Sequence, residues 1–103
     1  MGIIYLLTNG EGQYKIGITK YNAKKRIKSG LQTGNGDEIT VIEEFESKYN
    51  RKIESTLHRR YKAKRLKGEW FMLEKKDIQN FISECQSLHN NFEFLEDSGN
   101  PFI

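Results

Sequence analysis

Alternation of apolar and polar positions predicts a β-hairpin at the start of the chain. Residues 3–7 are rich in β-branched and aromatic side chains, and residues 13–18 resume the alternation after an Asn9-Gly10 turn signal. Tyr5 and Lys15 fall on the two neighbouring strands. The pattern leaves the register open, and with it whether these two side chains meet.

A period of about 3.6 residues then replaces alternation and predicts three helices: one after Asn22, one over residues 49–64 and one over residues 75–88. Their buried stripes would be Ala23, Ile27 and Leu31, then Ile53, Leu57 and Tyr61, then Ile78, Phe81, Ile82, Cys85 and Leu88. An extended segment over residues 69–73 separates the last two. We therefore expect an α/β (α+β) fold, in which helices flank a small, mainly antiparallel, three-stranded sheet.

We expect one domain over residues 1–88 and an acidic C-terminal tail over residues 89–103. No repeat and no Pro/Ser-rich linker divides the chain. The tail contains the large apolar residues Phe92, Phe94, Leu95 and Phe102, which would be exposed unless it packs back on the domain. Packing is the favoured prediction, and the alternative is a docking peptide.

Length and cysteine content limit the class of protein. A chain of 103 residues can bury one modest core, and no window has the apolar length of a membrane span or the profile of a signal peptide. The single cysteine, Cys85, excludes an internal disulfide framework, and with two histidines it cannot form a conventional zinc finger. Its place in an apolar stripe predicts a core thiol. We expect a cytoplasmic protein, phage-like or bacterial nucleoid-associated, without a membrane partner.

Charge is divided unevenly along the chain. Residues 15–67 contain 15 Lys or Arg and 6 Asp or Glu, whereas residues 68–103 contain 2 and 7. A basic segment neutralises phosphates, which indicates a nucleic-acid partner. The alternative for any single cation is a solvated helix face. The candidate nucleic-acid-binding residues are Lys20, Lys24, Lys25, Lys28, Arg59 and Arg65.

Three polar residues flank the predicted helical stripes. Glu54 and His58 lie one helical turn apart, just beside the stripe of their helix, and Arg26 lies just off the stripe of the first helix. All three could reach one cleft. The alternative for Glu54 is an ordinary surface ion pair with His58 or Arg51, which would contribute little to stability.

Six short segments occur in an order and spacing typical of one nuclease family. They are Ile3-Ile4-Tyr5, Lys15-Ile16-Gly17, Arg26, Leu31-Gln32-Thr33-Gly34-Asn35, Ile53-Glu54 with Leu57-His58, and Gly68-Glu69-Trp70-Phe71. Over residues 2–73 the chain resembles the GIY-YIG endonuclease superfamily, and in particular its compact clade of phage and bacterial open reading frames in which the second motif reads KIG.

The resemblance implies a divalent-metal-dependent endonuclease acting on DNA. Tyr5 would act on or near the attacking water, Arg26 would contact the phosphate, and Glu54 would hold one Mg²⁺ (or Mn²⁺). Lys15 stands where the more widespread motif has tyrosine. It would serve either as a neutral base or, as we favour, as a charged stabiliser of phosphate. His58 shares the Glu54 face and would carry a proton or support the site.

Two other function classes stay open. One is a catalytically weak or inactive nucleic-acid-binding module, and the other is a phage-type interaction or inhibitor protein that works through its acidic tail. RNA is not excluded as the partner. Because one such site handles one strand, cutting a duplex would need a homodimer or successive visits.

Overall fold

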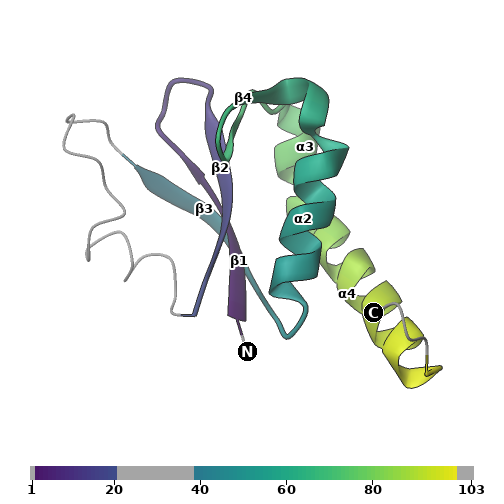
Figure 1. Ribbon diagram of the computed structural model, residues 1–103. Helices are drawn as coiled ribbons and strands as arrows, with labels where there is room; N and C mark the ends of the chain where they lie inside the picture. Colours follow the sequence, from purple (N-terminus) through teal and green to yellow (C-terminus); the bar gives the residue numbers. More distant parts are fainter. Residues whose placement is uncertain (1, 21–38, 100–103) are drawn as a thin grey trace.

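A computed structural model describes residues 2–20 and 39–99 of the chain. The helix expected after Asn22 lies outside these residues. Within them, a five-stranded antiparallel sheet carries the fold, in the spatial order β3-β1-β2-β5-β4 (Figure 1). The strands are β1 (Gly2–Thr8), β2 (Tyr14–Thr19), β3 (Thr40–Ser47), β4 (Arg65–Lys67) and β5 (Trp70–Phe71). The α+β class is confirmed.

The expectation of three strands was wrong, for two physical reasons. Strands β4 and β5 are too short to show a period of two, and all of β4 is exposed. Strand β3 has no regular alternation because its pairing with β1 shifts register between Leu6 and Leu7, which oppose Glu43 and Val41. The residue skipped by this β-bulge, Ile42, packs on the main core.

The predicted hairpin of β1 and β2 is confirmed, and its register is now fixed. Tyr5 lies opposite Gly17, whereas Lys15 lies opposite Leu7, so Tyr5 and Lys15 are not a cross-strand pair. Gly10 has a φ of 82°, which a glycine adopts without strain in the connecting turn.

Helices cover one face of the sheet (Figure 1). They are α2 (Asn50–Arg60), the short 3₁₀ helix η2 (Lys62–Lys64), α3 (Lys75–Gln79) and α4 (Phe81–Asp97). The stripe predicted for α2 is buried, and it packs on β1 and β2. The main core consists of Ile4, Leu6, Ile16, Tyr49, Ile53, Leu57, Tyr61, Phe71, Leu73, Phe81, Cys85 and Leu88. Among the described residues, no helix is both long and apolar enough to cross a membrane.

The helix expected over residues 75–88 is two helices. A capping box starts α3: the carboxylate of Asp77 accepts a hydrogen bond from the backbone N–H of Glu74, and the Glu74 side chain accepts one in return. Asn80 then separates α3 from α4 with a φ of −94° and a ψ of 0°. Helix α4 continues to Asp97, so most of the predicted tail is helical, and Phe92 packs against the core.

A smaller cluster lies on the opposite face of the sheet. Tyr5 and Leu7 are buried there, with Val41 and Trp70 packed against them. Because side chains alternate along β1, this face is the one turned away from α2. Tyr5 therefore belongs to a different layer from the helix residues Ile53 and Leu57.

Candidate active site

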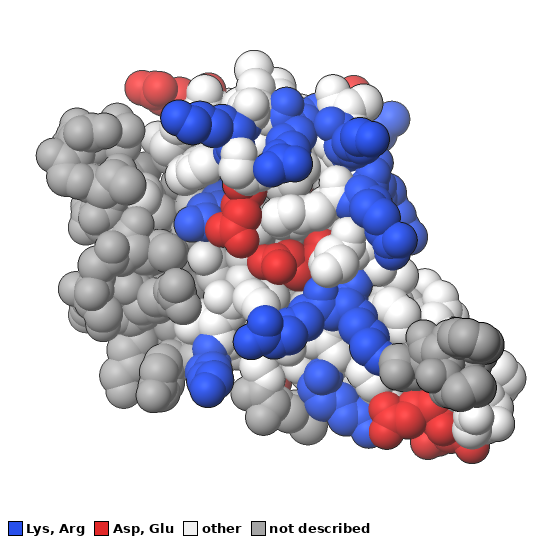
Figure 2. All heavy atoms as spheres, in the orientation of Figure 1, with Lys and Arg blue, Asp and Glu red and all other residues white. Residues whose placement is uncertain are grey.

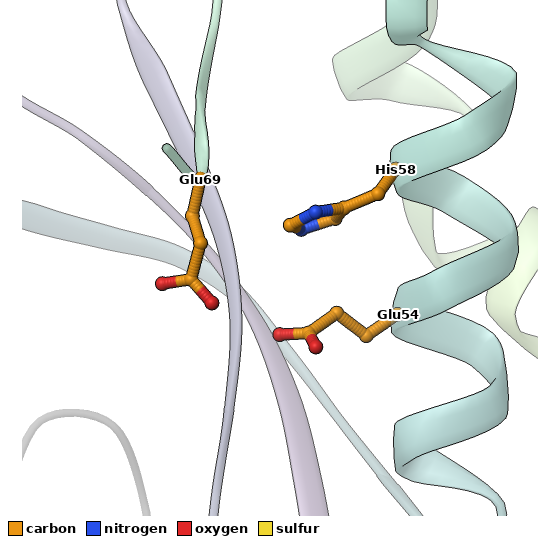
Figure 3. A group of neighbouring side chains, drawn as sticks. All are labelled: Glu54, His58 and Glu69. Carbon is orange, nitrogen blue, oxygen red and sulfur yellow. The ribbon is translucent and has the colours of Figure 1, made fainter. Parts of the chain in front are cut away.

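Three side chains that could bind a metal ion converge between α2 and the sheet. Glu54, His58 and Glu69 each offer one ligand atom, and these atoms all lie within 4.8 Å of one another. Figure 3 shows Glu54 and His58 pointing from α2 toward Glu69. Glu69 lies in the turn between β4 and β5. Each of the three residues is half-buried.

The helical period explains why α2 presents two of these groups together. Ile53 and Leu57 are completely buried against the sheet. Glu54 and His58 each follow one of them, and a step of one residue rotates a side chain by about 100° around the helix. The pair therefore lies at the border between the core and solvent, one turn apart, as the sequence predicts.

The backbone of Ile16 holds Glu69 and His58 in place. Its N–H donates a hydrogen bond to the carbonyl oxygen of Glu69 at 3.3 Å, and its own carbonyl oxygen lies 2.9 Å from Nε2 of His58. The imidazole also packs edge-on against Phe71, with ring centroids 5.0 Å apart. One residue of β2 thus fixes both the turn and the helix side chain.

Glu54 has an unusual electrostatic environment. Among the described side chains, its Oε2 is the buried oxygen that has no hydrogen-bond partner. Burial raises the pKa of Glu54, and the nearby carboxylate of Glu69 raises that pKa further, whereas His58 and Arg51 act in the opposite direction. A cation between the two carboxylates would relieve both costs. The residues therefore fit a divalent metal ion.

Lys15 reaches this cluster through Glu69. Its Nζ lies 3.4 Å from Oε2 of Glu69, and about a fifth of the lysine side chain is exposed. The positively charged ammonium group lies beside the two carboxylates and partly offsets their negative charge. Lys15 is thus placed where it could contact an anionic substrate.

Tyr5 approaches β2 from the other face of the sheet. Only 1% of this residue is exposed. Its phenol ring covers Gly17, where a β-carbon would lie 2.6 Å from the ring carbon Cζ. The ring therefore reaches the strand next to Ile16, but as part of a packed cluster. The absence of a side chain at Gly17 is what allows this position.

None of the remaining predicted site residues is seen to join this cluster. Lys20, Arg59 and Arg65 are exposed cations, and Nε of Arg65 donates a hydrogen bond to the carbonyl oxygen of Gly68 at 2.8 Å. Arg26 and the predicted nucleic-acid contacts Lys24, Lys25 and Lys28 lie outside the described residues. Glu69 was left out of the predicted site residues, because its place beside Glu54 and His58 depends on the β4–β5 turn.

Acidic and basic side chains occupy different parts of this face of the molecule. Figure 2 shows acidic side chains in the middle of the face, with Lys and Arg side chains around them. Such an arrangement attracts a polyanion to the outer Lys and Arg side chains and a small cation to the central acidic side chains.

A second group of polar residues resembles a hydrolase triad. Oγ of Ser47 lies 2.7 Å from Nδ1 of His89, whose Nε2 lies 3.6 Å from a carboxylate oxygen of Glu93. Ser47 is fully buried, however, and its Oγ also accepts a hydrogen bond from the backbone N–H of Tyr49. No substrate reaches this hydroxyl, so the group stabilises the packing of α4 and carries no chemistry.

Comparison with known proteins revises the family assignment. A family model described as the T5orf172 domain matches residues 2–86. No curated protein and no solved structure gives a significant match. The predicted membership of the GIY-YIG superfamily was wrong, because the matching model is that of a distinct domain family. The short motifs misled because packing alone requires several of their residues: Gly17 lies beneath Tyr5, and Phe71 fills the core.

Residue roles implied only by that resemblance lose their support. The T5orf172 domain is a phage-type domain associated with DNA binding. The homodimer considered as one way to cut a duplex is not supported. Since the family model matches most of the length of the chain, the chain belongs to the T5orf172 domain family.

Proposed function

We propose that this chain is a divalent-metal-dependent hydrolase of phosphodiester bonds in DNA. The observation that carries the proposal is the cluster of Glu54, His58 and Glu69, in which a buried carboxylate oxygen has no partner. Enzymes commonly keep such unsatisfied groups where a cation or substrate binds. The association of the family with DNA binding supports the choice of substrate.

The donor set indicates which metal ions would bind. Two carboxylates suit Mg²⁺ or Mn²⁺, whereas the histidine nitrogen favours Mn²⁺ over Mg²⁺. A bound ion would neutralise charge on the scissile phosphate. Glu54 and Glu69 would hold the ion between the helix and the turn, and His58 would complete the set.

The other residues of the site would act on the DNA. Lys15, beside Glu69, would keep its charge and stabilise the negative charge that develops on the phosphate. The surrounding Lys and Arg side chains would bind flanking phosphates, in keeping with the excess of cations over residues 15–67. Tyr5 would position β2 from the opposite face rather than exchange protons with solvent, since it is almost fully buried.

Incubation with supercoiled plasmid and with a branched DNA, in Mg²⁺, Mn²⁺ or EDTA, tests this function. We expect nicking that depends on the metal ion and disappears in Glu54→Gln. Glu43→Gln, which removes an equal charge from an exposed position of β3, is the matched control and should cut normally. Cleavage by Glu54→Gln at the wild-type rate would show that the cluster is not the active site.

A second candidate function is DNA binding without cleavage. It is favoured by the ion pair between Lys15 and Glu69, which already neutralises one of the two carboxylates. DNA binding that persists in EDTA, together with no nicking under either metal ion, would support this alternative over the hydrolase.

A further inference from the structure

An open groove of about 320 Å³ runs along α2 on the side away from the core. It is lined by Arg51, Lys52, Ser55, Thr56 and Arg59 of α2 and by Phe92 of α4. This volume is at the small end of the range for ligand sites, which suits one monomer unit of a polymer. Three cations, two hydroxyl groups and one aromatic ring thus share a single concave surface.

Among the described residues, none of the three cations of the groove forms a contact ion pair, although Arg51 and Lys52 interact electrostatically at longer range with Glu54 and Glu96. Lysine and arginine ion pairs among the described residues use Lys15, Lys48, Arg60, Lys64 and Lys76. None of these pairs involves Arg51, Lys52 or Arg59. Most of the paired cations join different elements of the fold, whereas those of the groove have no contact ion pair to break before they bind an anion.

The groove adjoins the carboxylate cluster on the same helix. Arg51 precedes Glu54 by three residues, so the two side chains are neighbours on the helix surface. The charge of Arg51 is close enough to oppose the rise in the pKa of Glu54. A strand with one phosphate at the cluster would therefore have its next unit within reach of the groove.

Phe92 makes the groove different from a plain basic patch. Its ring is half-buried and packs on Tyr49, with ring centroids 5.9 Å apart and an interplanar angle of 44°. Grooves that combine cations with an aromatic side chain are typical of sites for unpaired nucleic acid, because the ring offers a surface to an unstacked base. A duplex would keep its bases away from this ring.

We propose that the groove binds an unpaired nucleotide of the strand that is cut, next to the scissile phosphate. Arg51, Lys52 and Arg59 neutralise its flanking phosphates, and Phe92 contacts its base or sugar. This inference rests on the proposed function, since it takes the cluster as the position of the scissile group. It predicts a preference for DNA that is single-stranded on one side of the cut.

Binding of a labelled single-stranded oligothymidylate in EDTA, measured over a range of salt concentrations, tests the groove without cleavage. The double variant Lys52→Gln/Arg59→Gln should make the log–log salt slope less steep by about 1.4, because each phosphate contact on a single strand contributes about 0.7. The control Lys75→Gln/Lys76→Gln removes the same charge from α3 and should change the slope much less. Equal changes in both double variants would overturn the proposal.

Phe92→Leu separates stacking from charge. Leucine retains an apolar side chain, so thermal unfolding should show a folded protein. Affinity for the single strand should fall about fivefold or more, since one stacked base contributes at least that factor. Affinity for a hairpin duplex should change little, and a larger loss for the duplex would contradict the proposal.

The two proposals fail in different ways. If DNA binding depends on the groove but no metal ion supports nicking, the hydrolase is wrong and the groove stands as a binding site. If the protein nicks DNA and the groove variants behave as their control does, the groove alone is wrong.

Discussion

His58 and Ile16 connect the helix to the sheet through one hydrogen bond, in which Nε2 of the imidazole lies 2.9 Å from the carbonyl oxygen. Because a carbonyl oxygen only accepts, Nε2 must carry the hydrogen. The neutral ring then keeps the lone pair of Nδ1, the form in which histidine binds a metal ion. The backbone of β2 thus selects the tautomer of a side chain on α2.

We expect His58→Ala to change the choice of metal ion. Loss of the nitrogen ligand should weaken Mn²⁺ binding by about tenfold or more, whereas Mg²⁺, which prefers oxygen, should lose less. Calorimetric titration with each ion measures both affinities on the same sample, and the wild-type protein provides the reference ratio. An equal loss for both ions would show that His58 acts only through packing.

Metal binding should rise with pH over a range above that of an ordinary glutamate. Burial raises the pKa of Glu54, and Glu69 adds to the rise, so the carboxylate needed for a metal ion forms only at a higher pH than usual. Mn²⁺ affinity measured between pH 4 and pH 8 should show this dependence. Glu54→Gln should lose the part of this dependence that the Glu54 carboxylate contributes, and wild-type and variant profiles of the same shape would contradict the prediction.

Glu54→Gln should also stabilise the metal-free protein at pH 7. A carboxyl group with a raised pKa in the folded state contributes stability below its unfolded pKa and loses that contribution as the pH rises through its folded pKa. Replacing the buried charge beside Glu69 by a neutral amide should add about 0.5–1 kcal/mol, or ~2–8 °C in Tm. The gain should vanish near pH 4, where the wild-type group is protonated. In excess Mn²⁺ the wild-type protein should become the more stable of the two, because the ion binds only the wild-type protein tightly.

Lys15→Arg should retain most of the cleavage activity, and Lys15→Gln should lose most of it. Arginine keeps the positive charge beside Glu69 but cannot act as a base near neutral pH. Steady-state nicking rates at saturating metal ion distinguish a charged stabiliser of phosphate from a general base. An inactive Lys15→Arg that binds DNA normally would identify Lys15 as a general base.

Asp77→Asn should destabilise the fold at neutral pH without affecting the site. Burial alone would raise the pKa of Asp77, but hydrogen bonds from Lys64, at 2.6 Å, and from the backbone of Glu74 together lower it. We expect a loss of about 1–2 kcal/mol, the usual contribution of a helix cap with a charged partner. Because this pKa is lowered, the contribution exists above the unfolded pKa and disappears as the pH falls.

Chemical unfolding at pH 7 and at pH 3 measures this loss. Asp97→Asn, the same substitution at an exposed position at the end of α4, is the matched control and should change little at either pH. A penalty for Asp77→Asn that is as large at pH 3 as at pH 7 would show that charge is not involved.

Much of the fold could be predicted where one periodicity ran undisturbed. The hairpin and the stripe of Ile53, Leu57 and Tyr61 were correct because each lies on one continuous element. Prediction failed where periods were interrupted. The bulge at Ile42 hid β3, and the break at Asn80 divided a helix whose apolar stripe reads as continuous.

The site was predictable in part for the same reason. Glu54 and His58 share a face through helical spacing alone, which the sequence contains. Glu69 joins them only because β5 pairs with β2 and carries its turn to Ile16. That pairing joins residues far apart in the chain, and a two-residue strand leaves no pattern from which to infer it.

The phenol of Tyr5 lying on Gly17 has an evolutionary consequence. Any β-carbon at position 17 would collide with a ring that is itself packed in a buried cluster. Positions 5 and 17 therefore constrain each other: a lineage can give up the glycine only after the residue at position 5 has become smaller. Inheritance of the two as a pair would preserve the spacing between neighbouring strands, whatever chemistry the opposite face of the sheet performs.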